Sequence, residues 1–117
     1  MWVKLHDGMP DDPAVDHLSD GAFRLYVSAL CYSARELTNG YVSAARVPRL
    51  MPRYRPSYVS ELAAAGLWLD DLPGGYSIRN WDKYNQSREY WEDRHAKEAA
   101  RIAEFRARKK AEREGLS

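Results

Sequence analysis

Four arginines between residues 46 and 55 are the side chains whose type and spacing most directly suggest chemistry. They are Arg46, Arg49, Arg53 and Arg55. No acidic residue lies between positions 37 and 60. A guanidinium group can bind phosphate oxygens, or it can bind the edge of a guanine through two hydrogen bonds. The segment therefore predicts a contact with nucleic acid, and arginines that only keep a surface segment soluble are the alternative.

Two short helices are expected to position these arginines. Ser43 is a suitable N-cap for a helix over residues 44–50, and Ser57 is one for a helix over residues 58–65. Pro52 and Pro56 bracket a rigid turn between them, because proline fixes its own φ and restricts the residue before it. In a helix-turn-helix the second helix lies in the major groove, with its N-terminal residues at the base edges.

The predicted DNA contacts combine the arginines with hydroxyl groups at the start of the second helix. Serine and tyrosine hydroxyls can contact phosphate, as can the free N–H groups of a helix start. Two basic residues on or after a later strand could add phosphate contacts. The full set is Arg46, Arg49, Arg53, Arg55, Ser57, Tyr58, Ser60, Arg79 and Lys83.

The surrounding elements complete the order of a winged helix. An amphipathic helix over residues 20–37 and a minimal strand at residues 41–42 precede the helix pair. After the pair, two runs of strand formers flank a hairpin loop at residues 70–75. The predicted fold is mainly α with a small β-hairpin. A winged helix-turn-helix domain over residues 1–85 is followed by a charged C-terminal helix over residues 86–117.

The hairpin itself argues less directly for DNA. Its tip carries Asp70 and Asp71, which would repel phosphate, so a hairpin that only covers the core is an equal alternative. Trp68 and Trp81 are expected to fill the core beneath it, since Trp side chains are mostly buried.

The helix over residues 20–37 is expected to bury one face. Apolar side chains recur on it at steps of three and four residues. They are Phe23, Tyr26, Val27, Leu30, Ala34 and Leu37. Cys31, the single cysteine, is expected to be a small buried side chain. A shorter helix over residues 13–18 is expected before it, with Asp12 as its cap.

The chain changes character from residue 87 onward. This part is rich in Ala, Glu, Arg and Lys, and opposite charges four residues apart, such as Asp93 and Lys97, predict a long exposed helix. Its basic run at residues 106–110 could dock on phosphates. Glu112 and Glu114 partly cancel the field of that run, so a solvated helical face is the simpler interpretation.

The composition suits one small domain and excludes several classes of protein. The chain has 117 residues, of which 44% are hydrophobic and 30% charged, with a net charge of +1. No apolar run approaches the ~20 residues that span a bilayer, and the start lacks a signal-peptide pattern, so a cytoplasmic protein without a membrane partner is expected. Metal-ligand spacings and catalytic or nucleotide-binding motifs are absent from the sequence. We therefore expect no metal, no cofactor and no enzymatic activity.

Three segments resemble the sequence pattern of small phage and prophage proteins of actinobacteria. Residues 2–13 resemble the opening W-x-K-L-x-D-G-F-P-x-H-P, with Met9 and Asp12 in place of the usual Phe and His. Residues 29–42 are similar to A-L-x-Y-x-A…T-D-G-x-V, and residues 78–88 to I-x-D-W-x-x-Y-N-x-S-R. The resemblance implies a winged-helix DNA-binding domain like the N-terminal part of phage replisome organisers or replication initiators.

Two functions follow as predictions. The first is sequence-specific or structure-specific binding of duplex DNA in phage replication or regulation, through the helix that starts at Ser57, in the host cytoplasm if the protein is phage-encoded. The second is a protein–protein interaction module, in which the winged helix is a scaffold. In that case residues 87–114 bind a host or phage protein, or self-associate.

Overall fold

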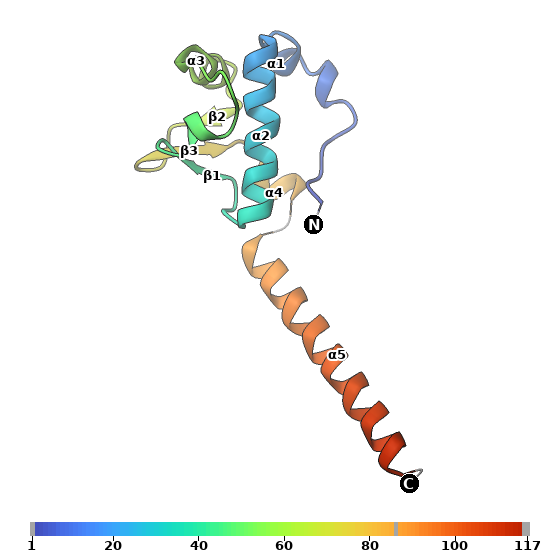
Figure 1. Cartoon of the computed structure of the whole chain (residues 1–117). Helices are drawn as coiled ribbons and strands as arrows, with labels where there is room; N and C mark the ends of the chain where they lie inside the picture. The colour runs from blue at the N-terminus through green and yellow to red at the C-terminus, as the bar shows by residue number, and fades with distance from the viewer. Residues whose placement is uncertain (1, 86, 116–117) are drawn as a thin grey trace. The chain divides into compact units, whose positions relative to one another are not determined.

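Figure 1 shows the computed structural model of the chain, which describes residues 2–85 and 87–115. The chain is mainly helical, with a small three-stranded antiparallel sheet and a long C-terminal helix, so the coarse fold class is confirmed. It divides into two compact units, Met1–Gln86 and Ser87–Ser117, and each is described by itself.

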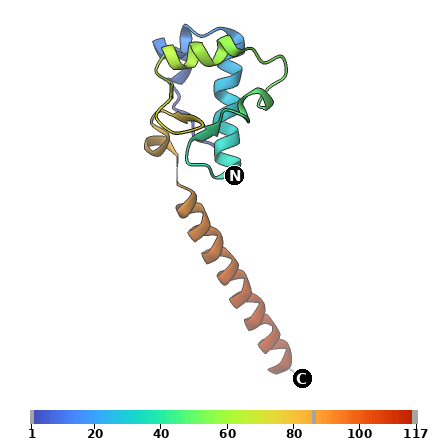
Figure 2. The same ribbon diagram turned by 90° about the vertical axis from the view of Figure 1, so that its left-hand side faces the viewer.

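The first unit contains short 3-10 helices (η), α-helices and strands. In chain order they are η1 (Met9–Asp11), α1 (Pro13–Asp16), α2 (Asp20–Glu36), β1 (Tyr41–Ser43), η2 (Val47–Arg49), α3 (Pro56–Ala64), β2 (Trp68–Leu69), β3 (Gly75–Ile78) and α4 (Trp81–Tyr84). The second unit contains α5 (Arg88–Gly115). Figures 1 and 2 show α3 at the N-terminal end of α2 and α4 at its C-terminal end.

Helix α2 is the centre of the first unit. Ser19 is its N-cap and accepts a hydrogen bond from the Ala22 amide. It ends at Leu37, which has a left-handed backbone with φ 56°. The buried face differs in part from the predicted one. Tyr26 and Leu30 are buried as expected, but Phe23 is exposed.

The sheet completes the core beside α2. Its strand order is β1-β3-β2, with Val42 opposite Tyr76 and Trp68 opposite Ile78. Trp68 is 1% exposed and Trp81 5% exposed, so the prediction that both fill the core is confirmed. These side chains cluster with Leu25, Ala29, Leu30 and Leu62 of the helices.

The segment before α3 differs from the prediction in two ways. Residues 44–46 form a turn and η2 spans three residues, where a helix over residues 44–50 was expected. The Arg46 amide still donates to Ser43 Oγ at 3.3 Å. In addition, α3 begins at Pro56, so Ser57 lies inside the helix and Arg55 occupies the N-cap position. A proline at the first helical position sets φ and holds the residue before it extended, which decides this boundary.

The structure adds one helical turn and overturns one further expectation. The turn is α4, whose Trp81 packs so closely on Gly40 that a Cβ there would lie 2.8 Å from Trp81 Cβ. Cys31 is exposed, because it lies on the side of α2 opposite the buried row.

Helix α5 is the long exposed helix that its sequence predicts. None of its described residues is buried. The predicted pair Asp93 and Lys97 is present, with Oδ2 and Nζ 3.0 Å apart. No helix in the described part of the chain is long and apolar enough to cross a bilayer.

Candidate nucleic-acid interface

The segment from η2 to α3 packs apolar side chains against the core and leaves its arginines exposed to solvent. Leu50, Met51 and Tyr54 are partly buried against the core, whereas Arg49 and Arg53 are exposed. Burial, and secondarily the neighbouring Tyr76, raises the pKa of Tyr54. The Tyr54 side chain packs against the core and fixes this part of the segment. Figure 2 shows this green segment looping outward from the body of the unit.

Arg53 occupies a backbone conformation that arginine rarely adopts. Its φ is 56°, in the left-handed region. For a residue with a Cβ this conformation costs on the order of 1 kcal/mol. Glycine would be the cheaper residue at this position, so the presence of arginine is better explained by its side chain than by the turn.

Arg46 lies flat against α2. Its guanidinium carbon is 5.1 Å from the centre of the Tyr32 ring, a cation–π distance. The contact holds the charge at the surface beside the turn. Among the described residues, none of Arg46, Arg49, Arg53 and Arg55 forms an ion pair with a carboxylate.

The exposed face of α3 carries small side chains. Ser57, Ser60, Ala63 and Ala64 are exposed, and Leu62 is buried. The Tyr58 ring packs against Gly21 of α2, because a Cβ on Gly21 would lie 2.1 Å from Tyr58 Cζ. The tyrosine thus packs on α2, while the two serines remain at the surface.

Glu61, the acid of α3, is used within the fold. Its Oε1 accepts the Ser19 amide at 2.8 Å and its Oε2 accepts the Ser19 hydroxyl at 2.6 Å. These two hydrogen bonds lower the pKa of Glu61. The carboxylate therefore sits at the N-terminus of α2, where a negative charge is favourable. It does not pair with the arginines of the turn.

Arg24 belongs beside this surface, although it was not predicted. Residues 21, 24, 28 and 32 lie on one side of α2 by helical spacing. Gly21 touches Tyr58 of α3, and Tyr32 carries Arg46, so the exposed Arg24 lies between these contacts. The helical spacing of residues 21, 24, 28 and 32 could have placed Arg24 on this side of α2, but only if the contacts of Gly21 and Tyr32 had been known.

Arg79 and Lys83 lie elsewhere. The Arg79 amide donates to Leu67 O, and its guanidinium lies beside Gly66, just after the C-terminal end of α3. Lys83 is on α4, at the other end of α2 from α3 (Figures 1 and 2). The structure brings together Arg46, Arg49, Arg53, Arg55, Ser57 and Ser60 around one turn, and it separates Arg79 and Lys83 from them.

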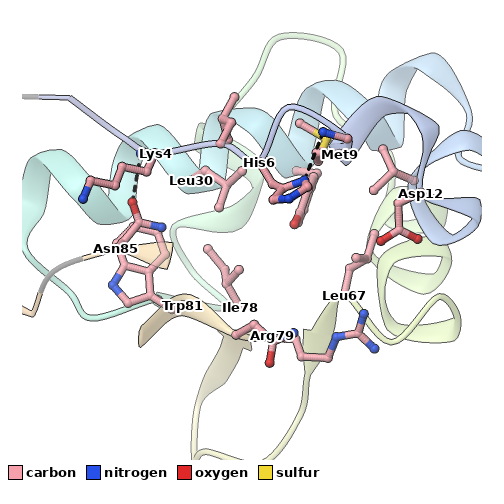
Figure 3. Close-up of a pocket in the computed structure, with 15 residues that line it drawn as sticks. Lys4, His6, Met9, Asp12, Leu30, Leu67, Ile78, Arg79, Trp81 and Asn85 are labelled. Carbon is pink, nitrogen blue, oxygen red and sulfur yellow. Dashed lines mark hydrogen bonds between the residues drawn. The ribbon is translucent and has the colours of Figure 1, made fainter. Parts of the chain in front are cut away.

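A cavity of about 130 Å³ lies on another side of the first unit (Figure 3). Buried apolar side chains such as Tyr26, Leu30 and Ile78 form its walls, and residues 4–9 pass over it. The Lys4 amide donates to Asn85 Oδ1 at 3.0 Å and holds this cover in place. Its lining is mixed, because Lys4, His6, Asp12, Arg79, Asn80 and Asn85 also border it, and none of Arg46, Arg49, Arg53 and Arg55 does.

No three His, Cys, Asp or Glu side chains of the described residues are grouped so as to hold a metal ion. Comparisons of this chain with protein-family models, with curated proteins and with solved structures gave no match.

Proposed function

We propose that this protein binds duplex DNA through the turn between η2 and α3 and the start of α3. The observation that carries the proposal is the set of four arginines within residues 46–55, in η2 and the segments on either side of it, which form no ion pair with an acidic side chain of the described residues. A surface that displays cations without pairing them favours a polyanionic partner.

The order and packing of the elements support a winged helix-turn-helix. Helix α2 is followed by a strand, the η2 turn, α3 and a hairpin, and the sheet order is β1-β3-β2. In this assignment α3 is the recognition helix and η2 is the remnant of the helix before it. The resemblance to phage replication proteins extends the proposal to a phage or prophage protein of DNA replication or regulation.

The small side chains of α3 define the kind of binding we propose. Serine and alanine let a helix approach the floor of a groove closely but cannot make the bidentate base contacts of arginine or asparagine. Most of the affinity would come from arginine–phosphate contacts, with any base reading left to Arg53 and Arg55 beside the helix start. The hairpin is assigned to covering the core, since Asp70 and Asp71 are exposed at its loop.

The test is the affinity for a short labelled duplex as a function of salt. Each phosphate contact contributes about 0.9 to the slope of log K against log salt. The variant Arg53→Ala/Arg55→Ala should lower the slope by about 1.8 and keep the wild-type unfolding curve. Arg35→Ala is the control for removing an exposed arginine, since Arg35 pairs with Glu36 on α2. A wild-type protein that does not bind duplex at low salt would exclude the proposal.

One observation favours the second function, an interaction module. Helix α5 leaves Ile102 40% and Phe105 53% exposed, three residues apart and so on the same side of the helix. A partner protein or a second copy could cover them. The mass of the full chain in solution tests self-association directly. A protein that stays monomeric at high concentration would exclude a second copy as the partner.

A further inference from the structure

Charge is divided between the two sides of α5. With about 100° of rotation per residue, one half of the helix is centred on Trp91, Ile102 and Phe105. That half carries six of the nine basic side chains of α5 and two of its seven acidic ones, and Arg108 lies at its border. The opposite half carries the alanine row and the other five acids. The net charge of α5 is small, so this separation is seen only when the two sides of the helix are compared.

The two acids on the basic half are both paired. Glu98 accepts from the guanidinium of Arg101, and Glu112 Oε2 lies 3.9 Å from Lys109 Nζ. Arg106 and Arg113 on the same half, and Arg108 at its border, have no ion pair with a described residue. This side of the helix thus keeps an excess of uncompensated positive charge.

The arginines also flank the apolar row on both sides. Arg94, Arg101 and Arg108 recur every seven residues along one edge, and Arg106 and Arg113 lie along the other. Two cations also contact the apolar row: Arg94 Cζ lies 5.9 Å from the centre of the Trp91 ring, and Lys109 Nζ lies 5.7 Å from the centre of the Phe105 ring. The major groove of DNA is about 12 Å wide, admits one α-helix and has a phosphate backbone on either side. Two basic edges on one helix match that arrangement.

Other occupants fit this face less well. A second copy placed face to face would oppose six basic side chains with six more, which is repulsive. Insertion into a membrane surface needs a broad apolar face, and here three large apolar side chains are spread over 28 residues. Charge complementarity therefore favours a polyanion.

We infer that α5 is a second DNA-contacting element, which lies in or along the major groove with its Trp91–Phe105 side toward the duplex. Arg94, Arg101 and Arg108 then face one backbone, and Arg106 and Arg113 face the other. The inference rests on the proposed function but concerns a separate surface. Ile102 and Phe105 can contact thymine methyl groups in the groove.

Two matched double variants of the full chain test this inference. Arg94→Gln/Arg106→Gln removes two charges from the basic half, one from each edge, and Lys97→Gln/Lys110→Gln removes two from the opposite half. Glutamine keeps the helix propensity in both. The first variant should lower the salt slope of duplex binding by about 1.8 and the affinity by at least about tenfold, whereas the second should leave the slope near the wild-type value. Far-ultraviolet circular dichroism confirms that both remain helical.

The outcomes separate this inference from the proposed function. If the wild type binds duplex and both variants keep its slope, the α5 inference is wrong and the proposed function stands. Equal slope losses in both variants would also overturn it, because net charge rather than one face would be responsible. If sedimentation instead shows that only the first variant changes a self-association equilibrium, a second copy occupies this face and the inference fails. A wild type that binds no duplex removes the proposed function itself.

Discussion

At the residue scale, the side chains of the candidate interface divide into those that anchor and those that are displayed. Leu50, Met51 and Tyr54 pack against the core, and Arg49 and Arg53 stay at the surface. This division allows stability and binding to be changed independently. Arg53, with its left-handed backbone, is the position where the two can be separated most clearly.

Arg53→Gly should weaken DNA binding without weakening the fold. Glycine removes one predicted phosphate contact, about 0.9 in the salt slope. It also relieves the left-handed strain, which offsets its greater freedom in the unfolded chain, so the free energy of unfolding should stay the same or rise by up to about 1 kcal/mol. Urea unfolding and duplex binding measure the two effects. Arg49→Gly is the comparison: Arg49 lies in η2, so glycine there should cost about 0.5–1 kcal/mol.

Glu61→Gln should remove a pH-dependent stabilisation. Two hydrogen bonds from Ser19 hold the folded-state pKa of Glu61 below its ordinary value. The carboxylate therefore stabilises the fold above the unfolded pKa of about 4.3, and this stabilisation is lost as pH falls through the lowered folded pKa. Wild type and variant should differ by about 1 kcal/mol at neutral pH, a typical value for a helix cap, and converge in acid.

Urea unfolding at neutral and acidic pH gives the comparison for Glu61. Glu36→Gln is the control, because Glu36 pairs with an exposed arginine on its own helix and should contribute little. A stability difference for Glu61→Gln that persists unchanged into acid would contradict the assigned role of the carboxylate.

At the element scale, the close contact between α4 and the end of α2 depends on Gly40. Gly40 has φ +85°, and a Cβ there would lie 2.8 Å from Trp81 Cβ and 2.9 Å from Cγ. Gly40→Ala should therefore cost more than about 2 kcal/mol, from backbone strain plus displacement of a buried tryptophan. Gly74 has φ +75° but only a contact at 3.6 Å to the Tyr41 hydroxyl, so Gly74→Ala should cost about 1 kcal/mol. Thermal or urea unfolding measures the loss of stability in both variants, and the difference between the two losses reports the contact with Trp81.

The elements also show what local sequence could and could not predict. Caps and strand formers predicted the starts of α1 and α2 and the two strands of the hairpin, because these signals act within a few residues. The buried row of α2 was only partly predicted, since Phe23 matches the helical period as well as Leu25 does, and packing against α3 and the sheet decides between them. The α3 boundary depended on whether Pro56 or Ser57 starts the helix, and the proline does.

The candidate site shows the same limit. The sequence contained the arginines of the turn and named the Tyr58 hydroxyl as a DNA contact, but it did not show that the Tyr58 ring packs against Gly21 of α2. Arg24 was missed, because only the contacts on either side of it in space place it near the turn. The positions of Tyr58 and Arg24 depend on contacts between segments far apart in the chain, which local sequence patterns do not show.

At the scale of the whole molecule, the two units obtain their stability from different sources. Residues 2–85 surround a buried core that includes Leu25 and Leu62, each 0% exposed. Helix α5 buries no described residue and is stabilised by pairs such as Arg88 with Glu92 and Asp93 with Lys97. Each such pair contributes a few tenths of a kcal/mol. A core unfolds cooperatively, whereas a helix held by local interactions melts gradually.

Heating should therefore produce two distinct transitions. Near-ultraviolet circular dichroism, which reports Trp68 and Trp81 in the core, should show a sharp step, and the signal at 222 nm should add a broad, sloping loss from α5. Leu25→Ala should destabilise the core by about 3 kcal/mol and move the sharp step to lower temperature, while the broad loss stays in place. Raising salt should weaken the surface pairs of α5 and increase the slope of the broad loss, with little effect on the sharp step. If both signals instead shift together in Leu25→Ala, the helix depends on the core, and its stability is not local.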